Sequence, residues 1–366
     1  MKKVLYSLLI LALAVACGKD EFKLNVTVSD ADQLPEGAVA FLLDSKGAAL
    51  DSVAIVDGSF TFTGAANPET MNVVTVKYPE KGARDRSWRM PFIPEKGTFN
   101  ATLSKEEWEM PGKNLTNAYD EYQKKVSDTY AEYREKAQAI PDEAEDEAEA
   151  LYDETMKKIA DISKEAIAQN PKNYIALGAL QNIIYDLNLE EFDEILSQCG
   201  KFVGETESVK RIHDCKVAEV ATAEGKPFVD FAGKTPEGED VKLSDFVGQG
   251  RWVLTDFWAS WCGPCMREIP NIKKTHETLA GDKFTVLGVA VWETNGDNTK
   301  SADRMKEKEM TWPQIFVGDD KTPTDSYGIV GIPTLILFAP DGTIYKRGDE
   351  LRGEKMLETI REIINQ

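Results

Sequence analysis

The sequence predicts an α/β C-terminal domain with a mixed central sheet flanked by helices, preceded by an N-terminal β-sandwich and an α-helical middle region. Three observations predict this order. Short alternating apolar runs separated by turn residues fill residues 24–110, helix-favouring residues dominate 113–220, and apolar strands alternate with helical patterns over 226–366. The chain has 366 residues, which is too long for one ordinary domain.

Composition and charge limit the possible functions. With 42% hydrophobic and 29% charged residues, the chain has enough apolar material for packed cores. The formal net charge of −20 argues against a nucleic-acid partner, because phosphate binding needs clusters of Lys and Arg.

The N-terminus has the pattern of a secretory signal. Two lysines precede an apolar stretch over residues 4–16, which is too short to span a bilayer as a helix. Small residues lead into Cys17, and the segment resembles the lipobox of bacterial lipoproteins. The resemblance implies a lipoprotein signal peptide over 1–16, a lipidated Cys17 and a tether over 17–23; residues 18–21 resemble a surface-export signal. We therefore expect a protein outside the cytoplasm, lipid-anchored to the outer membrane and periplasmic or surface-exposed. An ordinary signal peptide beside an incidental cysteine is the alternative.

The C-terminal region alternates strands and helices. Residues 252–258 and 284–291 are almost continuously apolar, as expected of strands that are covered on both faces of a sheet. A helical pattern follows Cys262 and reaches about residue 279. The other expected elements are a helix over 301–309, strands over 334–338 and 343–346, and a closing helix over 354–364.

The chemistry of this region centres on a Cys-Gly-Pro-Cys segment, residues 262–265, which follows a buried strand and begins a helix. A thiol attacks a disulfide only as the thiolate, and a free cysteine has a pKa of roughly 8.5. Unpaired N–H groups and the helix dipole favour the anion at a helix N-terminus, so we expect Cys262 to be the nucleophile. Cys265 lies one turn later and is expected to be the more buried, resolving thiol.

A Cys-x-x-Cys pair could also be half of a zinc site. Zinc usually needs four protein ligands, the sequence has no second such pair, and His213 and His276 offer no matching cluster. We expect no metal site.

Two segments resemble a known family. Residues 256–265 resemble the active-site segment of thioredoxins, and the stretch on to residue 270 resembles the membrane-tethered thioredoxins of the TlpA/ResA family. Residues 331–334 resemble the cis-proline loop of that family, and the first 220 residues resemble the sandwich and helical extension ahead of such domains in exported lipoproteins. The resemblance over 226–366 implies a thioredoxin-like fold and a thiol–disulfide oxidoreductase that needs no cofactor besides its redox-active disulfide.

The resemblance also implies roles for single residues. Asp256 matches the buried acid beneath the disulfide; desolvation should raise its pKa, so that it can accept a proton from Cys265. Glu268 matches a family acid that shares this task. Pro333 is implied to be cis and to place the backbone beside Cys262, where a substrate chain can pair edge-on. A structural Asp, an exposed helical Glu and an ordinary trans proline are the alternatives.

Substrate docking is expected at Trp261, Gly263, Pro264 and Ile332, whereas Trp258 is as well explained by a place in the core.

Two cysteines remain once the active-site pair and Cys17 are set aside. Outside the cytoplasm, Cys199 and Cys215 could form a structural disulfide. Two buried free thiols are the alternative.

The expected function is reduction of exported disulfide-containing proteins, with electrons supplied by an upstream membrane thiol–disulfide donor. Cytochrome c maturation and redox homeostasis of the cell envelope are the processes that the family implies. The Gly-Pro dipeptide is shared with thioredoxin, whose potential is about −270 mV, against about −120 mV for an oxidising periplasmic homologue. One alternative is a surface binding lipoprotein with an accessory redox domain. The other is a thiol peroxidase, although no Pro-x-x-x-Thr/Ser-x-x-Cys pattern ends at Cys262.

Overall fold

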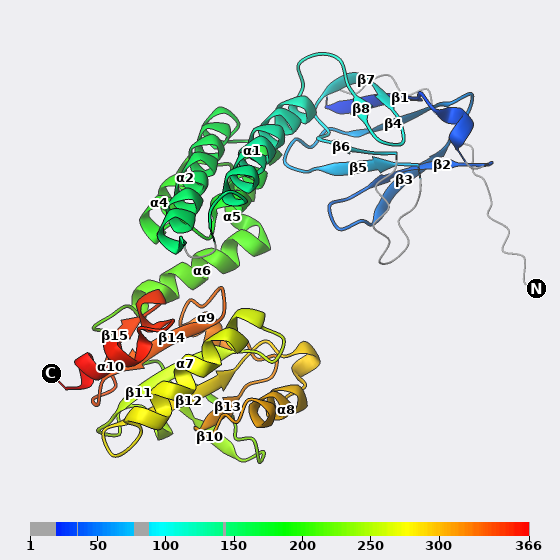
Figure 1. Ribbon diagram of the computed structural model, residues 1–366. Helices are drawn as coiled ribbons and strands as arrows, with labels where there is room; N and C mark the ends of the chain where they lie inside the picture. The colour runs from blue at the N-terminus through cyan, green and yellow to red at the C-terminus, as the bar shows by residue number, and fades with distance from the viewer. Residues whose placement is uncertain (1–19, 35, 77–87, 142–143, 366) are drawn as a thin grey trace, which may run out of the picture. The chain divides into compact units, whose positions relative to one another are not determined.

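The structure is a computed structural model that describes residues 20–34, 36–76, 88–141 and 144–365 (Figure 1). The chain divides into two compact units. The first comprises the residues up to Ile183 together with Ile195–Gly204, and the second comprises Ile184–Glu194 together with Glu205–Gln366.

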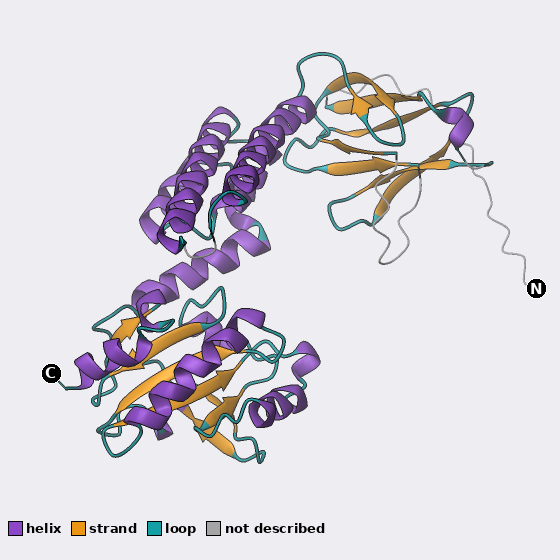
Figure 2. Cartoon of the chain, in the orientation of Figure 1, coloured by secondary structure: helices purple, strands orange, loops and turns teal. Residues whose placement is uncertain are grey.

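The N-terminal part is a sandwich of two four-stranded sheets (Figure 2), with strand orders β4-β1-β7-β8 and β3-β2-β5-β6. Its strands are β1 (Glu21–Val28), β2 (Val39–Leu43), β3 (Ala49–Ala54), β4 (Ser59–Ala65), β5 (Asn72–Thr75), β6 (Arg89–Phe92), β7 (Gly97–Leu103) and β8 (Trp108–Glu109). Alternate residues of β1, such as Leu24 and Val26, are buried and share one core with Met90 and Phe92 of the other sheet. The predicted β-rich N-terminal region is therefore present.

The middle of the chain is helical, as predicted. Its helices are α1 (Leu115–Ala137), α2 (Glu145–Gln169), α3 (Tyr174–Ile183), α4 (Leu189–Gln198), α5 (Lys201–Glu205) and α6 (Glu207–Ala221). The hydroxyl of Tyr122 lies 3.0 Å from that of Ser163 and accepts a hydrogen bond of 2.7 Å from Asn182. This buried polar group ties α1, α2 and α3 together.

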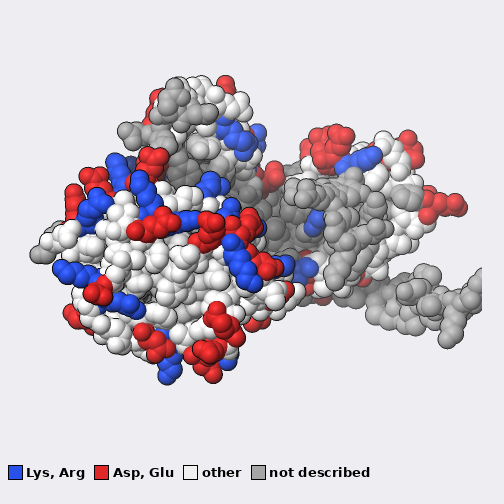
Figure 3. All heavy atoms as spheres, turned by 60° about the horizontal axis from the view of Figure 1, so that its bottom comes forward, with Lys and Arg blue, Asp and Glu red and all other residues white. Residues whose placement is uncertain are grey.

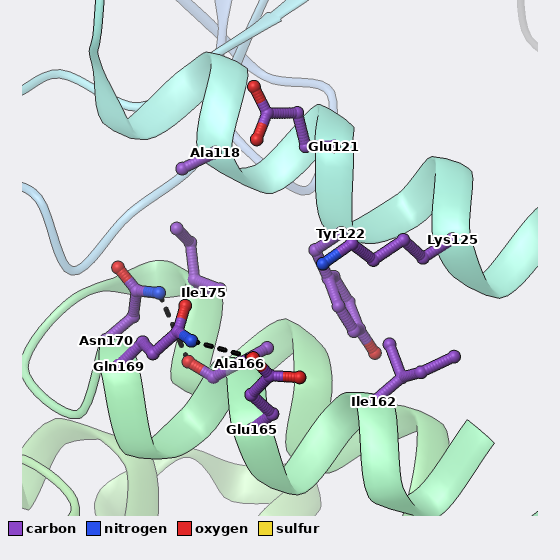
Figure 4. Close-up of a pocket in the computed structure, with 10 residues that line it drawn as sticks. All are labelled: Ala118, Glu121, Tyr122, Lys125, Ile162, Glu165, Ala166, Gln169, Asn170 and Ile175. Atoms are coloured by element: carbon purple, nitrogen blue, oxygen red, sulfur yellow. Dashed lines mark hydrogen bonds between the residues drawn. The ribbon is translucent and has the colours of Figure 1, made fainter. Parts of the chain in front are cut away.

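A pocket of about 90 Å³ lies between α1 and α2 (Figure 4). Polar side chains at its mouth bond within the pocket: Gln169 donates to Glu165 at 2.9 Å, and Asn170 donates to the Ala166 carbonyl at 3.2 Å. Its volume suits a few water molecules rather than a substrate.

The C-terminal part is built on a seven-stranded mixed sheet in the order β10-β9-β13-β12-β11-β14-β15. Strands β11, β12 and β13 run parallel to one another, whereas β14 is antiparallel to both β11 and β15. The elements are β9 (Ala232–Lys234), β10 (Asp240–Lys242), β11 (Trp252–Trp258), α7 (Gly263–Leu279), β12 (Phe284–Ala290), α8 (Thr299–Glu307), β13 (Gln314–Phe316), α9 (Thr322–Ser326), β14 (Thr334–Phe338), β15 (Ile344–Arg347) and α10 (Met356–Ile364).

Successive residues of the central strand pack into two different cores. Leu254 and Trp258 of β11 share a core with α7 and α10, on one face of the sheet. Val253 and Phe257 belong to a second core on the opposite face, together with Tyr327. The sheet is therefore covered on both faces, as the apolar strands predict.

Helix α6 belongs to the same compact unit as this sheet. A Cβ on Gly328 would collide with the backbone oxygen of Cys215 on α6, so only glycine allows this close approach. Just beyond the helix, the carbonyl of Thr222 accepts a 3.1 Å hydrogen bond from the Arg347 guanidinium, which also donates to the Tyr327 carbonyl at 2.9 Å. The sheet unit thus includes a helix that precedes it in the chain.

Several details differ from the predicted C-terminal elements; among them, the closing helix α10 begins at Met356 rather than at residue 354. Strand β13 and helix α9 were not predicted, since three and five residues are too few to show a period. Helix α8 begins two residues before the predicted start and ends two before the predicted end.

Among the described residues, none of the helices combines the length and the apolar character needed to cross a membrane. On the face that Figure 3 shows, basic and acidic side chains are interspersed around a broad uncharged area.

Candidate active site

Cys262 occupies the N-cap position of α7. Its backbone is extended (φ −79°, ψ 104°), and its Sγ atom accepts a hydrogen bond of 3.1 Å from the backbone N–H of Cys265. Pro264 lies in the first turn, where its missing N–H costs no helical hydrogen bond. The sulfur of Cys262 therefore lies at the positive end of the helix dipole, where a thiolate is stabilised.

Cys262 and Cys265 are joined by a disulfide, so the structure represents the oxidised form. Cys265 is fully buried, whereas 3% of Cys262 is exposed. Cys262 is thus the less buried of the two, as expected of the attacking cysteine; the division into an attacking and a resolving cysteine stays a prediction.

The loop before β14 faces this disulfide. The Ile332–Pro333 peptide bond is cis, and the carbonyl oxygen of Ile332 lies 3.7 Å from Sγ of Cys262. The hydroxyl of Thr334 donates to the Gly331 carbonyl at 2.7 Å, which closes the turn. The loop thus brings peptide groups next to the reactive sulfur, where an extended substrate chain can pair with them.

Asp256 is buried beneath the disulfide helix. It shares a face of β11 with Leu254 and Trp258, which pack in the core below α7. Only 1% of Asp256 is exposed, and neither carboxyl oxygen has a hydrogen-bond partner in the described part of the chain. Burial raises the pKa of Asp256 to about 7; the charge of Glu268 adds to this rise and that of Arg352 opposes it. The carboxyl group can therefore exchange a proton near neutral pH.

Glu268 is half-buried on α7, one turn beyond Cys265. Its Oε1 atom accepts hydrogen bonds from the backbone N–H of Gly353 at 2.9 Å and from the side chain of Asn271 at 3.1 Å. These bonds hold the carboxylate against the segment that precedes α10. From this position its negative charge raises the pKa of Asp256.

The predicted docking residues surround the disulfide. Trp261 is 57% exposed, and Gly263 and Pro264 are exposed on the first turn of α7. Trp258, in contrast, is fully buried and donates its indole N–H to Gln314 at 3.1 Å. Of the two tryptophans, only Trp261 offers an aromatic surface to a partner.

The turn after β12 forms hydrogen bonds with the residues that precede Cys262. No role for this turn was predicted from the sequence. The carboxylate of Glu293, which is 2% exposed, accepts hydrogen bonds from the N–H and hydroxyl of Ser260 at 2.7 and 2.8 Å and from the hydroxyl of Ser301 at 2.6 Å. The Trp261 indole donates to the Trp292 carbonyl at 3.0 Å. An acidic residue at the end of an almost continuously apolar run, residues 284–292, was the signal that could have identified this turn.

The other two described cysteines, Cys199 and Cys215, take no part in the disulfide. Both are free thiols in the structure; Cys215 is buried and Cys199 is half-buried, and a bridge between them stays a prediction. Burial raises the pKa of both thiols, and Sγ of Cys215 lies 4.0 Å from Asp325. Cys17 and the expected signal peptide lie outside the described residues. In the described part of the chain, no three His, Cys, Asp or Glu side chains are grouped as metal ligands.

Parts of the chain match known proteins. Residues 225–347 match the AhpC/TSA family, and residues 22–119 match a domain of unknown function, DUF4369. The chain is 30% identical over 128 residues to the thiol-disulfide oxidoreductase ResA of Geobacillus thermodenitrificans, covering 35% of this chain and 70% of that protein. It is 34% identical over 126 residues to the thioredoxin-like protein YneN of Bacillus subtilis, covering 34% of this chain and 71% of that protein.

Solved structures match the same share of the chain. The thioredoxin domain of a thiol-disulfide oxidoreductase from Bacteroides vulgatus is 31% identical, with a TM-score of 0.36, and the match covers 39% of this chain and 99% of that one. A thiol:disulfide interchange protein from a Bacteroides species is 32% identical, with a TM-score of 0.35, over 40% of this chain and 93% of that one.

Proposed function

Because the chain belongs to the family of thioredoxin-like thiol-disulfide oxidoreductases that includes ResA, we propose that it reduces disulfides of exported proteins outside the cytoplasm. The observation that carries this proposal is the Cys262 sulfur at the start of α7, which the Ile332 carbonyl faces at 3.7 Å. Cys262 is the less buried of the two cysteines, and the backbone beside its sulfur can hold a substrate chain.

The reduced enzyme would transfer two electrons in two exchange steps. The Cys262 thiolate attacks one sulfur of the substrate disulfide, and the other substrate sulfur leaves as a thiolate that takes a proton from solvent. Cys265 then loses its proton and attacks Sγ of Cys262. The mixed disulfide breaks, the second substrate thiol leaves, and the enzyme is left with its own disulfide.

We assign the proton of the second step to Asp256. Its pKa of about 7 lets the carboxylate accept the Cys265 proton at neutral pH. The hydrogen bonds of Glu268 in the described part of the chain go to Asn271 and Gly353, not to either sulfur. We propose that the charge of Glu268 raises the pKa of Asp256 and that Glu268 passes the proton of Asp256 on to solvent.

Recognition of the substrate would use the surface around the sulfur. The cis loop at Ile332 and Pro333 supplies backbone groups, and Trp261, Gly263 and Pro264 form the exposed rim. Since the cycle ends with an oxidised enzyme, a membrane thiol–disulfide donor has to return two electrons to it. Exported proteins that carry a Cys-x-x-Cys disulfide, such as apocytochrome c, are the substrate class that we propose.

The direction of electron flow can be tested by the reduction potential of the Cys262/Cys265 couple. We expect a value near −270 mV, because the Gly-Pro dipeptide is that of thioredoxin. Equilibration of the purified protein against glutathione and dithiothreitol buffers, read by thiol alkylation and mass, gives this value. Cys199→Ser is the control that should leave the potential unchanged. A potential above about −180 mV would contradict a reductant.

We also propose that Cys17 carries a lipid anchor, on the strength of the signal-like segment that precedes it. Several acyl chains on one residue would make attachment durable. Labelling of cells with a fatty-acid analogue should mark the wild-type protein and place it in the membrane fraction, whereas Cys17→Ser should lose both the label and the membrane association. The label should persist in a Cys199→Ser control. An unlabelled wild-type protein in the soluble envelope fraction would refute the anchor.

A further inference from the structure

A pocket of about 450 Å³ lies beside the cis-proline loop, within the unit that holds the sheet. One wall is the loop itself, the second is helix α6 with the turn at Tyr185, and the third is the segment that follows β15. Its lining residues are Tyr185, Lys216, Glu219, Gly328, Ile329, Val330, Gly331, Ile332, Pro333, Thr334, Arg347, Gly348 and Arg352.

The pocket and the reactive sulfur have Ile332 as a common neighbour. Ile332 lines the pocket and also places its carbonyl 3.7 Å from Sγ of Cys262. A polypeptide whose cysteine is bonded to Cys262 and which pairs with the Ile332 carbonyl runs along the pocket wall that Ile332, Pro333 and Thr334 form. Residues close to that cysteine would therefore enter the pocket.

The charges that line the pocket are mostly positive. Lys216 is only 8% exposed, and its Nζ donates to the backbone carbonyl of Tyr185 at 3.1 Å. The guanidinium of Arg347 donates to carbonyl and hydroxyl oxygens. Within the described ranges of the chain, neither of these two cations has a carboxylate at ion-pair distance, whereas Arg352 pairs with Asp349 at 2.7 Å.

Glu219 is the one acidic residue that lines the pocket beside these three cations, although Glu224 accepts a hydrogen bond from the Arg347 backbone N–H at 3.2 Å and both carboxylates act on the Arg347 charge. This balance is unusual in a chain whose formal net charge is −20. A partly enclosed cationic site strengthens its attraction for a carboxylate, because the surrounding protein excludes water and lowers the dielectric constant.

Two of the exposed residues that line the pocket offer apolar surface. Val330 on the loop is 39% exposed, and the side chain of Tyr185 opposite is 57% exposed. These side chains can contact the backbone and apolar side chains of an extended segment while its acidic group reaches the cations.

We propose that this pocket binds the substrate segment adjacent to the target cysteine and selects an acidic side chain in that segment. The inference rests on the proposed reductase function. Tyr185, Lys216 and Glu219 precede residues 225–347, the stretch that matches the AhpC/TSA family. The preference for an acidic substrate segment would therefore depend on residues outside the stretch that matches the family.

The test compares two short peptides, each with one cysteine in a mixed disulfide with 2-mercaptoethanol. One carries Glu at the positions flanking the cysteine and the other carries Gln there. With the reduced full-length protein, we expect the second-order rate constant for the Glu peptide to be about tenfold higher, and the ratio to fall as salt is added. Separation of the products by chromatography after acid quench gives both rates.

Two variants assign this preference to the pocket. Lys216→Gln should reduce the ratio of the two rates severalfold. Lys210→Gln is the matched control, since Lys210 lies on the same helix, its side chain is 67% exposed and it pairs with Asp214. Its ratio should equal that of the wild type. Thermal unfolding checks that Lys216→Gln folds; if it does not, the wild-type ratio and its salt dependence decide the question.

The outcomes separate this inference from the function on which it rests. Equal rates for the Glu and Gln peptides with the wild-type protein overturn the inference, while reduction of uncharged 2-hydroxyethyl disulfide by the same sample leaves the reductase function standing. Failure to reduce 2-hydroxyethyl disulfide overturns both. A preference that Lys216→Gln leaves intact in the folded variant overturns the assignment to this pocket.

Discussion

Replacement of Cys265 by alanine will leave the protein joined to its substrates through Cys262. The first exchange needs only the Cys262 thiolate, which the N-terminus of α7 stabilises through backbone groups that alanine at position 265 retains. The second exchange loses an intramolecular nucleophile whose effective concentration is on the order of 10⁵ M or more in well-oriented reactions. Turnover should therefore fall by at least about a thousandfold. Steady-state reduction of a protein disulfide by the purified variant measures this loss.

The trapped partners can be identified directly. Non-reducing gels of cells that express Cys265→Ala should show adducts that disappear with dithiothreitol, and mass spectrometry names the proteins in them. The double variant Cys262→Ala, Cys265→Ala should show none, and Cys199→Ala should keep wild-type turnover. Adducts that persist without Cys262 would contradict the division of labour between the two sulfurs.

Replacement of Asp256 by asparagine should make the folded protein more stable at high pH. The pKa of Asp256 is about 7 in the folded protein and close to 3.8 in the unfolded chain. Between these values the unfolded chain has released a proton that the folded protein still binds, so stability falls as pH rises through this window. Asparagine has no such proton. At pH 8 the variant should gain on the order of 4 kcal/mol at most, and below about pH 4 the two proteins should differ little.

The same variant should lose activity. In the wild type, the rate of the second exchange should rise with pH through about 7, as the Asp256 carboxyl group becomes able to accept the Cys265 proton. In Asp256→Asn we expect this inflection to vanish and the rate at pH 7 to fall by roughly ten- to a hundredfold. Denaturant unfolding at pH 4 and 8 and a pH–rate profile measure the two effects.

Asp282→Asn is the control, since Asp282 is exposed in the loop before β12. It should change neither the unfolding curve nor the pH–rate profile. If Asp256→Asn gave a profile that superimposes on the wild type, another group would have to receive the proton.

Much of this site could be predicted because its signals are local. The Cys-x-x-Cys spacing, the strand before it and the helix after it occupy one short stretch, and the relatives confirm the family and activity that this stretch predicts. Glu293 escaped prediction because its partners Ser260 and Ser301 lie 33 and 8 residues away and meet it only through the fold. For the same reason, no pattern in the sequence indicated that Lys216 would line a pocket with the cis loop.

Because α6 belongs to the sheet unit, it affects where the chain can be cut to make a fusion protein. A junction at Lys226 would look natural from the sequence, yet it would remove Thr222 from the Arg347 guanidinium and uncover the backbone of Gly328. A breakpoint upstream of Glu207 would keep these contacts, and it would carry Lys216 and Glu219 of the pocket along with the two cysteines.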